Sequence, residues 1–191
     1  TTLFRSHVKT HTEMSAQDSA AVSALEFFFR SNGQINTLFS RNDKWPNIDG
    51  TFEYVADPEI SRRPKQNFFV QIKGSHVYNI VDPGKVKFTL KSLGFPATIA
   101  TNVTLDPGIL FVVLDPDVRG SERVFWRYMS VDFINSIDFG KKSTTIVFDS
   151  SEEIFNTDES INEFCKKLDN IIEHHLFVNK LSATRIDINE I

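Results

Sequence analysis

Hydrophobic and polar residues follow two kinds of pattern along this chain, one typical of strands and one typical of helices. The longest apolar run is residues 108–114, Gly-Ile-Leu-Phe-Val-Val-Leu, which predicts a central strand buried on both faces. Residues 85–93 start with lysines alternating with apolar residues, which favours a strand over a short helix at that point. Further strands are expected over 35–40, 48–55, 77–81, 123–130 and 144–148.

Two amphipathic helices enclose these strands. The first begins at Ser15, where Ser15 and Asp18 have the spacing of a capping box, and its apolar stripe runs to Phe29. Asp18 and Glu26 both fall within that stripe, so each is a cap or edge residue or else part of a site. The second helix begins at residue 158. The elements predict an α/β domain over 15–178, after a lead-in at 1–14 and before a tail or linker at 179–191.

The strand predicted at residues 68–74, Phe-Phe-Val-Gln-Ile-Lys-Gly, carries polar residues on one face. Gln71 and Lys73 share a side because strand residues alternate, and Val70 and Ile72 share the other. Asp49 precedes a glycine on what is expected to be the preceding strand. The hairpin would then place an acid, an amide and an ammonium group at one end.

These three side chains suit the chemistry of a hard metal ion. A carboxylate and an amide oxygen are ligands for Mg²⁺ or Mn²⁺ rather than for zinc, and the backbone carbonyl of Ile72 could add a third oxygen. Lys73 could neutralise charge that develops on a phosphate. The combination of Asp49, Gln71 and Lys73 therefore fits metal-assisted hydrolysis of a phosphodiester.

Charge is distributed unevenly along the sequence. The net charge is −4, but residues 60–95 hold seven basic residues and one acid (7 − 1 = +6), whereas residues 149–191 hold four basic residues and ten acids (4 − 10 = −6). The basic stretch surrounds the candidate strand, where an anionic substrate would have to arrive. The candidates for contact with nucleic acid are Arg62, Arg63, Lys65, Lys85 and Lys87.

Other features narrow the class of protein. Cys165 is the single cysteine, which excludes an internal disulfide framework and fits a cytoplasmic, reducing compartment. No apolar run approaches the roughly 20 residues of a membrane helix, so no membrane association is expected. The chain opens on Thr1, which suggests a piece of a longer protein with further domains.

The order of these motifs resembles the core of the PD-(D/E)XK phosphodiesterase superfamily, in the Mrr-like branch where Gln replaces the second acid. More narrowly, the chain is similar to an uncharacterised bacterial family of that superfamily. The likeness covers residues 15–130. Its motifs are Asp49-Gly50, Gln71-Ile72-Lys73, an apolar strand ending in Asp115-Pro116, and Phe125-Trp126.

The resemblance implies a restriction-endonuclease-like core with a central mixed sheet flanked by helices. It also implies that Asp49 and Gln71 bind Mg²⁺ or Mn²⁺, that Lys73 is the catalytic lysine, and that Asp18 is the acid of the first helix. The expected function is a DNA endonuclease, the effector domain of a larger bacterial defence or restriction protein, with a homo-oligomer possible. An inactive fold that binds nucleic acid or protein, and a nuclease acting on RNA or tRNA, are the alternatives.

Overall fold

A computed structural model describes residues 16–30, 32–40, 47–60, 63–82, 84–101 and 106–188, and for 177–188 its backbone alone. The expected lead-in, Ser15 and Arg62 lie outside these ranges. The helices are α1 (Ala16–Phe29), α2 (Gly94–Thr101), α3 (Val131–Asn135) and α4 (Asp158–Ile188), with a short 3-10 helix at Ser150–Glu152. The strands are β1 (Ile35–Phe39), β2 (Gly50–Tyr54), β3 (Gln66–Ser75), β4 (Asn79–Asp82), β5 (Lys85–Leu90), β6 (Gly108–Leu114), β7 (Arg123–Tyr128), β8 (Thr144–Phe148) and β9 (Glu153–Ile154).

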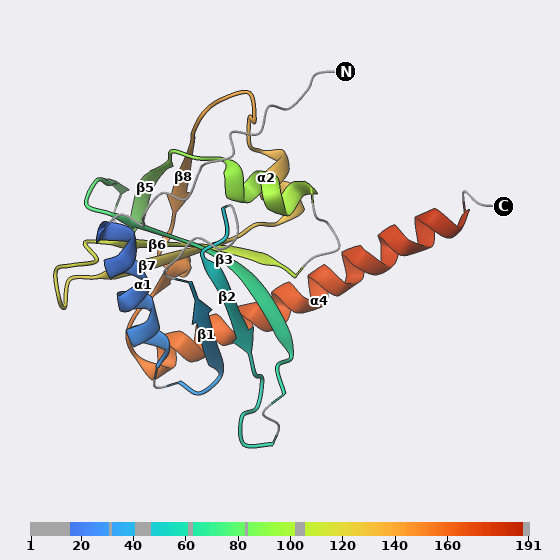
Figure 1. Ribbon diagram of the computed structural model, residues 1–191, viewed down its shortest axis with the longest axis horizontal. Helices are drawn as coiled ribbons and strands as arrows, with labels where there is room; N and C mark the ends of the chain where they lie inside the picture. The colour runs from blue at the N-terminus through green and yellow to red at the C-terminus, as the bar shows by residue number, and fades with distance from the viewer. Residues whose placement is uncertain are drawn as a thin grey trace.

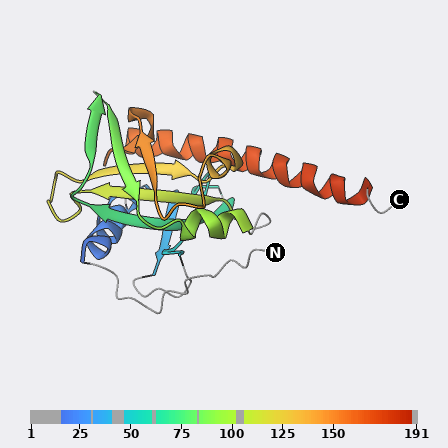
Figure 2. The same ribbon diagram turned by 90° about the horizontal axis from the view of Figure 1, so that it is seen from above.

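The central sheet is mixed, as predicted, and has the strand order β1-β2-β3-β6-β7-β9 (Figure 1). β3 pairs antiparallel with β2 and parallel with β6, and the connection from β3 to β6 passes through α2. A second sheet of three strands has the order β4-β5-β8. In Figure 2 its strands run steeply to those of the central sheet. The fold class is therefore α/β with a mixed sheet flanked by helices.

One face of the central sheet is covered by α1 and α4 over a core rich in phenylalanine. Phe164 of α4 lies 5.8 Å from the ring of Phe29 in α1 and 6.0 Å from the ring of Phe111 in β6. Three even-numbered residues of β3, Phe68, Val70 and Ile72, belong to this core. Burial of large aromatic side chains is what holds the two helices on the sheet.

The other face is covered by the smaller sheet together with α2 and α3. Residues of β5 point inward and outward in turn, with Val86, Phe88 and Leu90 buried, which confirms the expected strand. β6 contributes to both cores and is fully buried from Gly108 to Leu114, as its apolar run predicts. The odd-numbered residues of β3 face this second side, where Phe69 packs against the core.

The observed elements differ from the sequence predictions in three respects. Helices α2 and α3 have no predicted counterpart, because α2 carries Pro96 in its first turn and both are too short to show an apolar period. The strand expected at 77–81 lies at Asn79–Asp82, entirely exposed. The tail or linker expected at 179–191 is helical as far as Ile188. α4 continues to Ile188 with no glycine or proline to end it, and extends past the sheet in Figure 1.

Candidate functional site

The site forms where β2 stops pairing with β3. Along β3 the even-numbered residues turn their backbone groups toward β2, as the hydrogen bond from Asp49 N to Val70 O (2.8 Å) shows. At the next even position the acceptor is a side chain: Ile72 N donates to Asp49 Oδ2 at 2.6 Å. The Ile72 carbonyl points to the same edge, since N–H and C=O of one strand residue share a side. Asp49 is only 6% exposed.

Two residues further along β3, the carboxylate of Asp18 in α1 also accepts a hydrogen bond from a backbone N–H group. Gly74 N donates to Asp18 Oδ1 at 3.0 Å, although 56 residues separate them. The helix can come this close because residue 74 has no side chain: a Cβ there would lie 2.8 Å from the Gln17 carbonyl carbon, and closer to its oxygen. The residues alone leave open whether Asp18 or Glu26 is the helical acid that reaches the strand, whereas the resemblance implies Asp18. In the structure it is Asp18.

Gln71 is the other buried polar residue, 4% exposed, on the face of β3 opposite the aromatic core. Its Nε2 donates to the carbonyl oxygen of Asn47 at 3.4 Å. Its Oε1 is buried and has no hydrogen-bond partner, the single such side-chain atom among the described residues. A buried acceptor without a donor costs about 1–3 kcal/mol, so an oxygen left in this state needs an explanation.

Lys73 joins the two acids. Its Nζ lies 3.9 Å from Asp18 Oδ2 and 4.0 Å from Asp49 Oδ2, and its side chain is 27% exposed. The structure therefore brings together Asp18, Asp49 and Lys73, with Gln71 on the same face of β3 as Lys73. Two carboxylates around one ammonium group leave a negative charge, which favours a cation.

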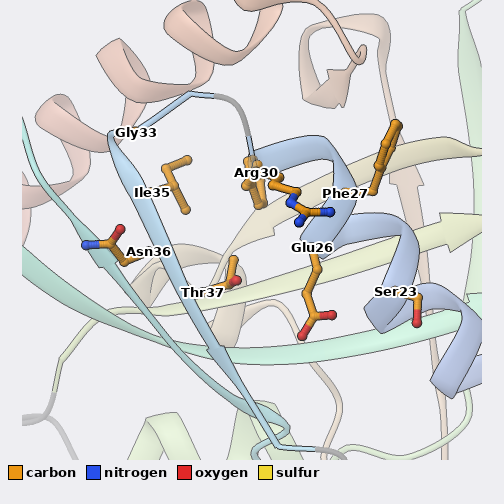
Figure 3. Close-up of a pocket in the computed structure, with 9 residues that line it drawn as sticks. Ser23, Glu26, Phe27, Arg30, Gly33, Ile35, Asn36 and Thr37 are labelled. Atoms are coloured by element: carbon orange, nitrogen blue, oxygen red, sulfur yellow. The ribbon is translucent and has the colours of Figure 1, made fainter.

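Glu26 lies elsewhere on α1, beside an open cavity of about 560 Å³ between α1 and β1. In Figure 3 its side chain and that of Arg30 come from the helix, and those of Asn36 and Thr37 come from the edge strand. The residues that line this cavity do not include those of the cluster around Lys73. The candidate chemistry lies along β3 rather than in the cavity, because there the buried Asp49 and the partly buried Asp18 both accept hydrogen bonds from backbone N–H groups.

The basic residues are more dispersed than the sequence suggests. Lys65 precedes β3 and forms an ion pair with Asp169 of α4 at 2.6 Å. Lys65 and Lys73 lie toward opposite ends of the strand, and the usual rise per strand residue places them roughly 26 Å apart. Arg63 is exposed near that same end. Lys85 and Lys87 are exposed on β5 in the smaller sheet. Their contact with nucleic acid stays a prediction.

A second polar cluster follows β3 directly and has no counterpart in the sequence reasoning. His76 lies between two acids, with Nδ1 2.9 Å from Asp115 and Nε2 2.9 Å from Asp117, and Tyr78 donates to Asp115 at 2.9 Å. The hydrogen bond to Asp115 raises the pKa of His76, and the same bond lowers the pKa of Asp115. The two acids flank the His76 ring on its two nitrogen sides, so the cluster joins the ends of β3 and β6.

Cys165 and Trp126 are core residues. Both are buried, and burial raises the pKa of the Cys165 thiol to about 12, which leaves it protonated and inert at neutral pH. Within the described ranges there is no group of three His, Cys, Asp or Glu side chains placed to hold a metal ion, so an ion at β3 would need the oxygens of Gln71 and the backbone. No helix in these ranges is long and apolar enough to cross a bilayer.

Comparison with protein-family models, with curated proteins and with solved structures found no match for this chain. Function therefore has to be inferred from the residues and their geometry.

Proposed function

We propose that this chain is a metal-dependent nuclease domain that hydrolyses phosphodiester bonds of DNA. The observation that carries the proposal is the buried Gln71 Oε1, which has no hydrogen-bond donor among the residues that the structure describes. A divalent cation at the edge of β3 would satisfy it. Gln71 shares its face of the strand with Lys73, which lies within 4.0 Å of Asp18 and Asp49.

The donor set fits Mg²⁺ or Mn²⁺. Asp49 and Gln71 offer hard oxygens, the Ile72 carbonyl points to the same edge, and Asp18 can add a second carboxylate. When bound, such an ion lowers the pKa of a coordinated water and stabilises charge on phosphoryl oxygens. Both carboxylates already accept a backbone hydrogen bond, so they are held in place before any ion or substrate arrives.

The ammonium group of Lys73 would bind a phosphate oxygen of the substrate. Its ammonium group lies within 4.0 Å of both acids and its side chain is 27% exposed, so that a phosphate oxygen can reach it from solvent. There it would stabilise the negative charge that grows during the displacement. The chain order α1-β1-β2-β3, followed after β4 and β5 by α2 and β6, also supports the resemblance to the PD-(D/E)XK core. In this arrangement the helical acid, the Asp-Gly pair and Gln-x-Lys meet where β2 stops pairing with β3.

The biological setting is proposed on the sequence alone. The resemblance to a bacterial family suggests an effector domain of a larger defence or restriction protein, in which other domains or a second copy supply recognition. The single cysteine fits a cytoplasmic setting.

Incubation of the protein with plasmid DNA and Mg²⁺ or Mn²⁺ tests the activity. Asp49→Asn and Lys73→Ala should each lower the cleavage rate about 100-fold or more, the loss typical when a preorganised electrostatic group is removed. Asp138→Asn and Lys141→Ala change the same residue types at exposed positions 62% and 72% accessible, and should cut like the wild type.

Two results would overturn the proposal. Cleavage that persists in both site variants, or without the metal in a chelator control, would place the activity elsewhere. A folded wild type that neither cuts DNA nor binds Mn²⁺ in calorimetry would favour a nuclease-like fold used for binding. The same reactions with a single-stranded RNA in place of the plasmid separate DNA from RNA as the substrate.

A further inference from the structure

The residue that orients Gln71 is Asn47, which lies two positions before Asp49. Asn47 has φ +69°, a left-handed conformation that asparagine tolerates better than most residues. From this turn its backbone carbonyl accepts the hydrogen bond of Gln71 Nε2. Because the amide nitrogen is directed to Asn47, the amide oxygen is directed the other way.

The side chain of Asn47 is held in turn by the start of α2. Its amide group lies against Gly94, in the space where any other residue would place a Cβ. A Cβ at position 94 would lie 2.8 Å from Asn47 Nδ2 and closer to Oδ1 and Cγ. Real Cβ atoms essentially never come this close to another heavy atom. The absent side chain of Gly94 thus determines where the Asn47 amide can lie.

We infer that Asn47, lodged against Gly94, is a positioning residue that sets the orientation of the Gln71 amide. The inference rests on the proposed function, since it explains why Oε1 rather than Nε2 is presented as the ligand. It also explains the choice of Gln at position 71. A carboxylate there would set an oxygen against the Asn47 carbonyl, where the amide sets an N–H donor.

Three variants isolate this contact. Gly94→Ala should displace the Asn47 side chain and loosen its turn. Asn47→Gly keeps the carbonyl and favours the positive φ, but removes the side chain. In the double variant Asn47→Gly/Gly94→Ala, the new Cβ meets no amide, so the turn should be restored. Gly140→Ala, at an exposed turn, is the matched control for replacing glycine by alanine.

The first readout needs no metal. In NMR spectra the side-chain amide of Gln71, assigned by its absence in Gln71→Leu, should exchange slowly with solvent in the wild type and in Gly140→Ala. It should exchange at least tenfold faster in Gly94→Ala and slow again in the double variant. Equal exchange in Gly94→Ala and wild type would overturn the inference, as would a double variant that stays as fast as Gly94→Ala.

The second readout is Mn²⁺ affinity by calorimetry, with thermal melts to show that each variant is folded. Gly94→Ala should bind Mn²⁺ 10–100-fold more weakly, the usual loss when a group that orients a ligand is removed, and the double variant should recover. A role in stability alone would lower the melting temperature and leave the affinity unchanged, which would also overturn the inference. A wild type that binds no Mn²⁺ would refute the proposed metal site, whereas the NMR result would still report whether Asn47 holds Gln71.

Discussion

Gly74→Ala is the substitution whose effect follows most directly from the geometry. The new Cβ would lie 2.8 Å from the carbonyl carbon of Gln17, and ordinary contact begins at 3.4 Å, so α1 has to retreat by at least 3.4 − 2.8 = 0.6 Å. The hydrogen bond from Gly74 N to Asp18 Oδ1 is 3.0 Å long. A retreat of that size lengthens it to about 3.6 Å, beyond the range of a hydrogen bond.

The energy of this change can be bounded. Loss of a hydrogen bond to a charged acceptor costs about 1.5–3 kcal/mol. If the helix instead keeps its place, the overpacking costs about 1–3 kcal/mol. Alanine also lowers the conformational entropy of the unfolded chain, which raises the free energy of unfolding by about 0.4–1 kcal/mol and offsets part of this loss. We expect Gly74→Ala to lower the free energy of unfolding by about 1–2 kcal/mol, and to weaken Mn²⁺ binding because Asp18 leaves the site.

Urea denaturation followed by circular dichroism measures the first quantity without any metal. Gly140→Ala again serves as the control, and Asp18→Ala completes a double-mutant cycle. Because Gly74→Ala and Asp18→Ala remove the same hydrogen bond, their effects should be less than additive. A Gly74→Ala protein as stable as the control, or strictly additive effects in the cycle, would refute the claim that Gly74 admits α1 to the site.

Two further predictions concern other parts of the fold. His76 has a raised pKa through Asp115, so its ion pair stabilises the protein fully below its ordinary value of 6.5, and this contribution disappears as pH rises through the higher folded value. Urea midpoints of the wild type should therefore fall across that interval, and those of His76→Ala should not; parallel curves would contradict this. Phe164→Ala removes a ring whose centroid lies within 6.5 Å of four aromatic rings, and should cost about 3–5 kcal/mol of unfolding free energy by the same method. A loss below about 1 kcal/mol would show that the core closes around the cavity.

The sequence was sufficient for the features that depend on local periodicity. The apolar run at 108–114 predicts β6 because a strand buried on both faces has apolar residues at every position. The alternation at 85–90 predicts β5 because a strand buried on one face has apolar residues at every second position. Gln71 and Lys73 follow from the same alternation. Helices α2 and α3 leave no such trace, and the end of α4 has no glycine or proline to mark it.

The contacts that assemble the site depend on pairs far apart in the chain. The local sequence around Asp18 predicts a helix cap. Its hydrogen bond with Gly74 depends on how α1 packs against the end of β3, which the local sequence does not show. Asn47 and Gly94 could not be paired from the sequence, since neither has a distinctive neighbour. An asparagine two residues before the Asp-Gly pair is the one local hint, because asparagine tolerates a left-handed turn.

The alternation along β3 indicates which residues would change first in related chains if selection for the proposed metal site were relaxed. Even positions such as Ile72 belong to the aromatic core and would persist, because replacing them removes burial. Gln71 is different, since its unpaired oxygen destabilises the native state by about 1–3 kcal/mol, and an apolar residue of similar size would relieve that strain. A descendant without the proposed metal site should therefore keep the fold and lose Gln71 early. The residue at position 71 would then distinguish related chains that retain the site from those that retain only the fold.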